Sequence, residues 1–492
     1  MSSKNKVLLI RAKNIYNYNN YPPLGLIHLA TVLKLNNYEP LIINSHLEAD
    51  IFATIKKHLN DCLFVGLTLL TGEIPEAYEI MKFIKENSNV PIVVGGWHCT
   101  LFPEQTADCE YIDYLIPGEG EERIVEVATI IKEGRKISSK IFPKQVLDLE
   151  KLPTPDYSLD SNIENYIINF LTDKLAGYVR RPMRWLPYDS SRGCPSLCTF
   201  CINVVTNNTH YRKKSAEKVL FDIELIVKKY NLSHLKFIDD NFFVDIVRAR
   251  KICQGIVDNG LNITWDAECR CDYFNDHMIN EESLALFKKS GLVQLTLGVE
   301  SGSQNTLNIM KKGITPIQGE NAIKVCSEHG IIPRCAFMIE VPGETMDDIK
   351  KTVTFVKKLR KYDHFTCGLQ IFRPYPKCEL TDKMIKDGTF REPAAFTEWR
   401  NKDVIEMYST HQYIRPWHVN GVYSEAAAYY NTMESGVSLS ASMLPNPVDR
   451  LILWLFIATA KIRNRLDFYR WPVDRKLYKK FFTRVYQMFN KK

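Results

Sequence analysis

Short apolar segments alternate with amphipathic segments through the first 134 residues, and this alternation constrains the fold more than any other feature of the chain. The apolar runs lie at 7–10, 39–44, 63–70, 91–97 and 113–119. Amphipathic stretches of helical length lie between them at 23–35, 49–59 and 75–87. Strands that are apolar throughout and separated by helices are buried on both faces, which is typical of a parallel, doubly wound sheet. We therefore expect a Rossmann-like α/β domain over residues 1–134.

A second series of apolar segments begins near Trp185, after a more polar stretch. Residues 135–184 contain Pro153 and Pro155, which disfavour helix, and we interpret them as a linker. Strand-like segments then recur at 234–240, 262–268, 293–300, 332–343 and 367–376. Five or six βα units in series predict a partial (β/α)6 barrel over residues 185–380. The pattern of residues 381–492 is mostly helical, so the fold class is α/β with a helical C-terminal region.

Three cysteines lie within eight residues in the first loop of the second series. Cys194, Cys198 and Cys201 have the spacing C-x3-C-x2-C, with Gly193 and Pro195 supplying turn chemistry beside the first cysteine. A [4Fe–4S] cluster takes four thiolates, so three would leave one iron open to another ligand. Two alternatives are a zinc site completed by His210 and cysteines without a metal. Because no secretion signal precedes the first domain, we expect a cytoplasmic protein whose thirteen cysteines are thiols or metal ligands.

The segment SRGCPSLCTFC resembles the cluster loop of radical S-adenosylmethionine (SAM) enzymes. FIDDNF (237–242), LGVESGSQ (297–304), FMIEVPGET (337–345) and FRPYPKCEL (372–380) resemble later motifs of that family, in the same order. The resemblance implies a [4Fe–4S] cluster on the three cysteines, with SAM bound to the fourth iron and cleaved to a 5′-deoxyadenosyl radical. The SAM-binding residues that it implies are Phe200, Asp239, Asp240, Arg270, Glu300, Ser301, Pro342 and Gly343.

Some of these residues have a simpler interpretation. An acidic pair such as Asp239-Asp240 at a strand end is, taken alone, more often a helix cap or a solvated turn. Glu268, Arg270 and Asp272 alternate on one face of a strand, where Arg270 could bind the SAM carboxylate bidentately. Cys269 and Cys271 then point to the other face, where we expect packing rather than catalysis. Two positions depart from the family pattern: Glu340 replaces a frequent glycine, and Lys377-Cys378 replaces Gly-Thr. Tyr375 is a candidate substrate contact, with ordinary packing as the alternative.

The first domain resembles the cobalamin-binding domain that precedes the barrel in one subclass of the same family. Small residues there allow a backbone to approach a flat macrocycle or its nucleotide tail. The implied cobalamin-binding residues are Pro23, Gly25, Thr68, Gly72, Gly95, Gly96, His98, Gly118, Glu119 and Gly120. The cobalt-ligating pattern D-x-H-x-x-G is missing, and NSHLEA (44–49) only echoes it. We therefore expect cobalamin without a histidine ligand, with His46 as the alternative ligand and His98 facing the cofactor or packed in its loop. A generic nucleotide-fold module without a corrin stays open.

Basic residues are concentrated in the tail. Residues 450–492 hold twelve Lys/Arg against two Asp, more than the whole net charge of +7. The apolar start of the tail, 451–460, is about half the length that spans a bilayer. It could lie in a membrane interface at the inner face, or form a helical cap that packs on the barrel. No recognised nucleic-acid-binding module is present.

The combined resemblance implies a cobalamin-dependent radical SAM methyltransferase that acts on an unactivated carbon of a small molecule or lipid. An electron donor such as flavodoxin or ferredoxin is the expected partner. Radical cyclisation, oxidation or rearrangement without net methylation is the alternative within enzymes. A corrinoid or redox sensor is the non-enzymatic alternative.

Overall fold

The computed structural model describes residues 5–14, 21–135, 137–167, 183–401 and 446–466, and a few single positions after residue 401. The chain forms two compact units. The first unit comprises Met1–Asn169, Arg184–Asp240 and Arg373–Thr410, and the second comprises Phe170–Met183, Asn241–Phe372 and His411–Lys492. Each unit is described by itself below. The predicted tail and the loop after the first strand lie partly outside the described residues.

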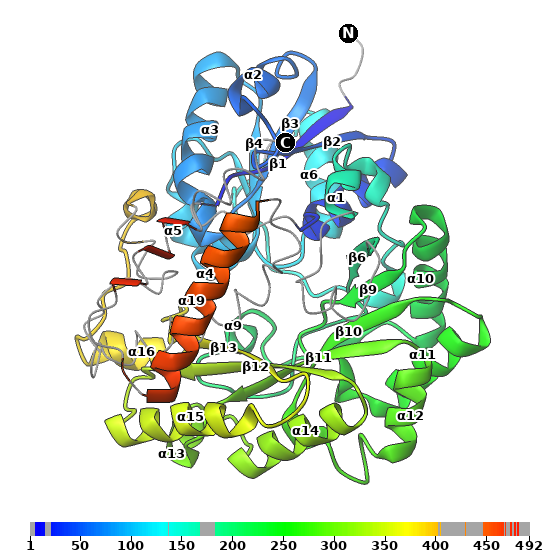
Figure 1. The fold of residues 1–492 in the computed structure, drawn as a ribbon. Helices are drawn as coiled ribbons and strands as arrows, with labels where there is room; N and C mark the ends of the chain where they lie inside the picture. Colours follow the sequence, from blue (N-terminus) through cyan, green and yellow to red (C-terminus); the bar gives the residue numbers. More distant parts are fainter. Residues whose placement is uncertain are drawn as a thin grey trace. The chain divides into compact units, whose positions relative to one another are not determined.

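The first unit contains the expected Rossmann-like sheet. Its strands are β1 (Lys6–Arg11), β2 (Glu39–Asn44), β3 (Cys62–Thr68), β4 (Ile92–Gly95) and β5 (Tyr114–Ile116), all parallel and in the order β2-β1-β3-β4-β5. Helices α1 (Leu24–Leu35) and α6 (Glu121–Lys132) lie on one side of the sheet, and α2 (Ile51–Lys56) and α3 (Ile74–Asn87) on the other (Figure 1). Most strand residues are buried, as the apolar runs predicted, and the first half of the edge strand β2 is the more exposed part.

Residues 137–167, which we expected to belong to a linker, are part of the first unit and pack within it. Leu115 forms a parallel bridge with Ile141, and Leu147, Leu149 and Leu152 form a small buried cluster. The segment continues in two single turns, Leu149–Lys151 and Tyr157–Leu159, and in α7 (Ile163–Ile167). The prolines stop a long helix from forming, but the regularly placed leucines and tyrosines still bury their side chains.

The first unit also holds the start of the barrel and the segment after its last strand. Strands β6 (Trp185–Tyr188) and β9 (His234–Phe237) pair in parallel, and α10 (Ala216–Tyr230) connects toward β9 after an N-cap at Ser215. The short strands β7 (Ser191–Arg192) and β8 (Arg212–Lys213) pair antiparallel, and α9 (Ile202–Thr206) lies in the loop between them. After residue 372 come α16 (Glu379–Lys386) and the turn Phe396–Arg400.

The second unit carries the remaining βα repeats. Strands β10 (Thr264–Cys269), β11 (Leu292–Glu300), β12 (Ile332–Ile339) and β13 (Thr366–Ile371) are parallel and adjacent in chain order. They alternate with the helices α11 (Ile246–Asp258), α12 (Glu281–Lys289), α13 (Gln304–Ile309), α14 (Pro316–Glu328) and α15 (Met346–Leu359). Helices α14 and α15 run along β12 (Figure 1). Capping boxes at Thr315 and Thr345 fix where these two helices begin. The predicted partial-barrel fold is confirmed.

The C-terminal helix α19 (Pro447–Leu466) belongs to the second unit. Within the described part of the chain, no helix combines the length and the apolar character that crossing a bilayer requires.

Candidate functional site

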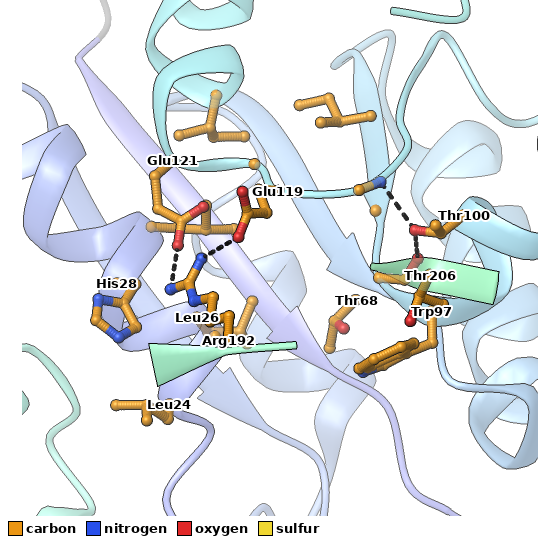
Figure 2. A pocket seen from close by; sticks show the side chains of 18 of the residues that line it. Leu24, Leu26, His28, Thr68, Trp97, Thr100, Glu119, Glu121, Arg192 and Thr206 are labelled. Carbon is orange, nitrogen blue, oxygen red and sulfur yellow. Dashed lines mark hydrogen bonds and ion pairs between the residues drawn. The ribbon is translucent and has the colours of Figure 1, made fainter. Parts of the chain in front are cut away.

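A cavity of about 790 Å³ opens at the carboxyl ends of the strands of the first unit. Its walls come from the ends of β1, β3, β4 and β5, from α1, and from the segment around β7 and β8 (Figure 2). This is where the alternation of strands and helices predicted a ligand. Eight of the ten residues expected at a cobalamin site line it: Pro23, Gly25, Thr68, Gly95, Gly96, Gly118, Glu119 and Gly120.

Glycine is required where two loops of the cavity meet. Gly96 has a φ of 100°, and a Cβ there would lie 2.9 Å from the Thr68 Oγ1 atom. Thr100, on the short helix α4 (Trp97–Leu101), joins this loop to the one after β5. Its hydroxyl donates to the Gly96 carbonyl at 2.9 Å and accepts from the Gly118 amide at 2.8 Å. At these glycines the cavity wall is backbone, which lets a flat ligand approach there without Cβ clashes.

His98 does not line the cavity, contrary to the expectation that it faces the cofactor. The imidazole is fully buried and packs beside Phe102 and Trp399, with centroid distances of 5.2 and 5.0 Å. Its Nδ1 atom lies 3.3 Å from the Thr71 hydroxyl, and burial lowers its pKa to about 3. A neutral, buried ring is the packed alternative of the sequence analysis. The reason is helical phase: α4 begins at Trp97, so Trp97 and Thr100 line the cavity and His98 turns away.

Gly72 and His46 also lie apart from the cavity lining. A Cβ on Gly72 would meet the Asn14 side chain at 2.8 Å, so this glycine serves packing. His46 Nε2 accepts a hydrogen bond from the Asn14 amide at 3.1 Å. Burial, with Arg11 and Lys13 nearby, lowers the pKa of His46 to about 4. The Nε2 atom is thus occupied by a backbone hydrogen bond, which does not favour His46 as a cobalt ligand.

Sequence reasoning missed two features of the cavity. Trp97 lines it with 42% of its surface exposed, the largest aromatic side chain that faces this space. Arg11 and Glu73 form a buried pair at the lining, with 3.3 Å between Arg11 Nε and Glu73 Oε1. Burial raises the pKa of Glu73 to about 7 even though Arg11 lowers it. The string GGWHCT offered a signal for Trp97, whereas nothing local indicated that Arg11 and Glu73, 62 residues apart, would meet.

A network of ion pairs joins the cavity to the start of the cysteine loop. The Arg192 guanidinium lies between Glu119 and Glu121 (Figure 2), at 2.9 and 2.8 Å, and its Nε donates to Asp189 at 2.9 Å. Arg212 donates to Glu119 at 2.7 Å. Glu119 was expected to bind cobalamin, and in the structure it holds both arginines.

The charges in this network keep one another ionised. Burial is the largest effect on the Asp189 carboxyl and raises its pKa, yet His28, Lys214 and Arg192 together hold that pKa well below its usual range. His28 Nε2 lies 2.9 Å from Asp189 Oδ1. Burial likewise opposes the charge of Arg192, but its three carboxylate neighbours raise its pKa well above the ordinary value. A buried charge is tolerated only with such compensation.

The loop that carries the three cysteines is closed at its base by β7 and β8. Gly193, directly after β7, has a φ of 85°, and a Cβ there would lie 2.1 Å from the His210 carbonyl oxygen. The Gly193 amide donates to Asp240 at 2.7 Å. Asp239, fully buried, accepts from the Ser190 amide at 2.6 Å and the Ser191 hydroxyl at 2.7 Å. Both acidic residues, expected to bind the SAM amino group, here hold the base of the cysteine loop.

Cys194, Cys198 and Cys201 lie close together within this loop. The Cys201 amide donates to the Cys198 carbonyl at 3.1 Å, and Cys201 is the N-cap residue of α9. Burial, together with the nearby Cys198, Cys194 and Asp240, raises the pKa of the Cys201 thiol to about 11. Three crowded thiolates repel one another, and cationic iron removes that repulsion, so the donor set fits an iron–sulfur cluster. Phe200 is half-buried beside them.

Among the described residues, no group of three or more His, Cys, Asp or Glu side chains is arranged to hold a single metal ion. In the zinc alternative, His210 would be the fourth ligand. His210 lines the cavity. Cys378, in the segment that departs from the family pattern, is buried near Cys201, and burial raises its thiol pKa to about 12.

The other residues expected to bind SAM belong to the second unit. Glu300 ends β11 and accepts from Lys312 Nζ at 2.7 Å, and the Ser301 hydroxyl lies 2.7 Å from that of Thr352. Pro342 and Gly343 form the turn between β12 and α15, where Gly343 has a φ of 92°.

Arg270 follows β10 instead of lying within it. Its guanidinium binds both Asp272 oxygens, at 2.9 and 3.2 Å, and the Lys312 carbonyl at 2.8 Å. The bidentate fork that we expected to hold the SAM carboxylate is thus directed at Asp272. Cys269 and Cys271 are buried, as expected of packing cysteines, and burial raises the pKa of the Cys271 thiol to about 12.

Both departures from the family pattern fall on left-handed backbone. Glu340 has a φ of 61° and Lys377 a φ of 60°, a region that glycine occupies without strain and other residues at a cost of about 1 to 2 kcal/mol each. This explains why a glycine is frequent at these positions.

Two family models match this chain. The model of the B12 binding domain matches residues 14–128, and that of the radical SAM superfamily matches residues 188–356. An uncharacterized methyltransferase of Pyrococcus horikoshii is 31% identical over 382 residues, covering 75% of this chain and 79% of the relative. The chain belongs to the cobalamin-binding radical SAM family. Its cofactors are a [4Fe–4S] cluster, SAM and cobalamin, and the family's enzymes need an electron donor and a small-molecule substrate.

More distant relatives also match this chain. An anaerobic magnesium-protoporphyrin IX monomethyl ester cyclase of Rubrivivax gelatinosus is 24% identical over 393 residues, covering 74% of this chain and 66% of the cyclase. The radical SAM methyltransferase TsrM of Kitasatospora setae, solved with cobalamin and a [4Fe–4S] cluster, has a TM-score of 0.63 at 19% identity, covering 80% of this chain and 76% of its own.

The cobalamin-dependent radical enzyme OxsB, solved with aqua-cobalamin and SAM, has a TM-score of 0.67 at 19% identity, covering 98% of this chain and 75% of its own. These likenesses confirm the fold. Because the chain is a radical SAM enzyme, the sensor alternative is not supported.

Proposed function

We propose that this enzyme transfers a methyl group from cobalamin to an unactivated carbon of its substrate. The observation that carries the proposal is that one compact unit contains both the cavity at the strand ends and the three-cysteine loop, joined through Arg192. When bound, the cofactors supply the electron that cleaves SAM, the radical that activates the substrate carbon, and the methyl group. We further propose the boundaries 1–134, 185–380 and 381–492 for the three functional parts.

The residues of the chain would bind, orient and shield these groups. Cys194, Cys198 and Cys201 would hold the cluster. The backbone around Gly95-Gly96 and Gly118–Gly120 would receive the corrin or its nucleotide tail, because these glycines line the cavity and carry no Cβ that would obstruct it. Asp239 and Asp240 would keep the cysteine loop in one conformation. The mostly apolar lining of the cavity would exclude water from the reacting atoms.

Cys198→Ala tests the cluster assignment. After anaerobic reconstitution, we expect the variant to lose the [4Fe–4S] absorbance and the formation of 5′-deoxyadenosine from SAM and dithionite, while still binding hydroxocobalamin. Cys109→Ala is the matched control, because Cys109 is a buried cysteine of the same unit away from the loop. A Cys198→Ala protein that retains four irons and cleaves SAM would reject the assignment.

Cyclisation or oxidation without methylation is the second candidate, since a porphyrin cyclase is among the relatives. The by-product distinguishes the two. Methyl transfer consumes a second SAM to remethylate cobalamin, so S-adenosylhomocysteine should accumulate together with 5′-deoxyadenosine. A product without added methyl, formed with 5′-deoxyadenosine alone, would favour the cyclase. We propose a flavodoxin or ferredoxin as the electron donor.

We also propose that the C-terminal helix rests on an anionic membrane surface. Five apolar side chains of α19 form one stripe at helical spacing, each more than half exposed: Val448, Leu451, Leu455, Ile462 and Leu466. The opposite face packs within the tail, where Leu453 is buried with Phe481. The exposed stripe therefore supports the interfacial interpretation of the tail.

The charges beside the stripe favour lipid as its occupant. Lys461 and Arg465 are exposed on α19, as is Trp454, and Trp and basic residues at the edge of an apolar face suit an anionic interface. Leu451→Glu combined with Leu455→Glu should abolish co-sedimentation with phosphatidylglycerol vesicles. Ile317→Glu, at an apolar side chain 78% exposed on α14, is the control. Equal binding of all three proteins, or no binding by the unmodified protein, would refute the membrane contact.

A further inference from the structure

We propose that Arg192 is a positioning residue that links the ligand state of the cavity to the order of the cysteine loop. Arg192 ends β7 and stands two residues before Cys194. Two of its three carboxylate partners, Glu119 and Glu121, belong to the segment between β5 and the first turn of α6, which forms one wall of the cavity. One guanidinium thus bridges two segments that are 73 residues apart in the chain.

The second strand at the base of the loop is tied to the same carboxylate. Arg212 on β8 is the register partner of Arg192. It donates to Glu119 Oε2 at 2.7 Å and to Oε1 at 3.1 Å, and also to the Leu147 carbonyl at 3.0 Å. Glu119 therefore binds both ends of the cysteine loop, and any displacement of its carboxylate changes the hydrogen bonds to β7 and to β8.

Neither the cavity wall nor the cysteine loop can move away alone without leaving charged side chains of this network without a counter-charge. Burial is the largest effect on the Glu119 carboxyl and raises its pKa, but Arg212 and Arg192 bring that pKa below its usual range. If the Glu119 carboxylate moved away, the guanidinium groups of Arg192 and Arg212 would repel each other with little water to screen them. Conversely, if the cysteine loop left, Glu119 and Glu121 would lose their counter-charge. Breaking such partly buried pairs is unfavourable, because it leaves a charge without a partner.

The position of Glu119 within the cavity wall provides the link. Gly118 and Gly120, its neighbours on both sides, line the cavity, and the Gly118 amide is held by Thr100. A ligand that packs against this backbone restricts the conformations of Glu119, and through Arg192 and Arg212 those of the loop from residue 193 to 211. Such coupling is reciprocal, so an ordered cysteine loop should equally favour ligand binding.

Amide hydrogen exchange of the cluster-free protein tests this link without any turnover. Exchange in peptides covering 190–213 is measured with and without saturating hydroxocobalamin. We expect the unmodified protein to show at least about five-fold slower exchange with the ligand, the lower end of typical coupling. Arg192→Lys keeps the positive charge but cannot bridge three carboxylates, and should bind hydroxocobalamin while losing this slowing.

Glu122→Gln is the matched control. Glu122 neighbours Glu121 on α6, is exposed, and binds Gln145 instead of either arginine. It should retain the full ligand-linked slowing. If Arg192→Lys fails to fold, Glu121→Gln, which removes one of the three carboxylates, replaces it.

Two results would overturn the proposal. One is an unmodified protein that binds hydroxocobalamin with unchanged exchange at 190–213. The other is an Arg192→Lys or Glu121→Gln protein whose slowing equals that of Glu122→Gln. A purely structural network would lower stability in these variants and leave the ligand-linked difference intact. Because the measurement uses neither SAM nor the cluster, its outcome is independent of the methyl-transfer proposal.

Discussion

Gly193→Ala should displace the cysteine loop. The left-handed backbone at Gly193, with a φ of 85°, costs an alanine about 1 to 2 kcal/mol. The added Cβ would also lie 2.1 Å from the His210 carbonyl oxygen. A backbone atom at that distance must retreat by more than 1 Å, since ordinary contacts begin near 3.4 Å.

The retreat has a second cost. Gly193 donates its amide to the Asp240 carboxylate at 2.7 Å, and a hydrogen bond to a charged group contributes about 1.5 to 3 kcal/mol. If the clash breaks this bond, the total destabilisation is about 2.5 to 5 kcal/mol. The loss is concentrated where β7 and β8 close the loop, so the three cysteines should no longer converge.

The assay compares Gly193→Ala with Gly388→Ala. Gly388 lies in the same unit with a φ of 70° and no atom within 4 Å of its Cβ position, so its variant measures the backbone cost alone. We expect urea unfolding to show the larger loss for Gly193→Ala, and anaerobic reconstitution to give iron-poor protein only for that variant. Equal stability of the two variants, with full iron content in both, would refute the steric reasoning.

Three further predictions follow from the same site. Glu73 has a pKa of about 7 in the folded protein and an ordinary value of 4.5, so between these pH values folding is coupled to the uptake of a proton. The free energy of unfolding therefore falls as the pH rises from about 4.5 to 7. The free energy of unfolding falls by about 3 kcal/mol over this range. Glu73→Gln should abolish this pH dependence in urea unfolding measured between pH 5 and 8. An unchanged pH profile would show that Glu73 is not the group responsible. Trp97 faces the cavity, so hydroxocobalamin should quench its fluorescence, and Trp97→Phe should reduce the quenched fraction without abolishing binding; identical quenching would place the ligand elsewhere. Asp239→Asn should lower iron retention in the absence of SAM, because Asp239 holds Ser190 and Ser191, whereas unchanged iron content with weaker SAM binding would restore the direct role inferred from the motif.

Local pattern was sufficient for much of the fold. The five apolar runs of the first unit became five parallel strands because a strand buried on both faces must be apolar at every position. The eight expected residues that line the cavity were implied by the resemblance to the cobalamin-binding domain, and most of them lie at the ends of buried strands, where a parallel sheet exposes its backbone. The cysteine spacing is likewise local, and its interpretation needed no contact from elsewhere in the chain.

Only the tertiary structure decided which side chains already have partners. Arg270 looked available for a ligand but binds Asp272, and Asp239 looked like a ligand-binding carboxylate but holds Ser190 and Ser191. The sequence could not predict that Glu119 and Arg192 meet, because the free energy of an ion pair depends on distance and burial, and residues 73 apart have neither until the chain is folded. Periodicity reports which face of an element is buried. The pairing of charges between elements is a property of the packed molecule.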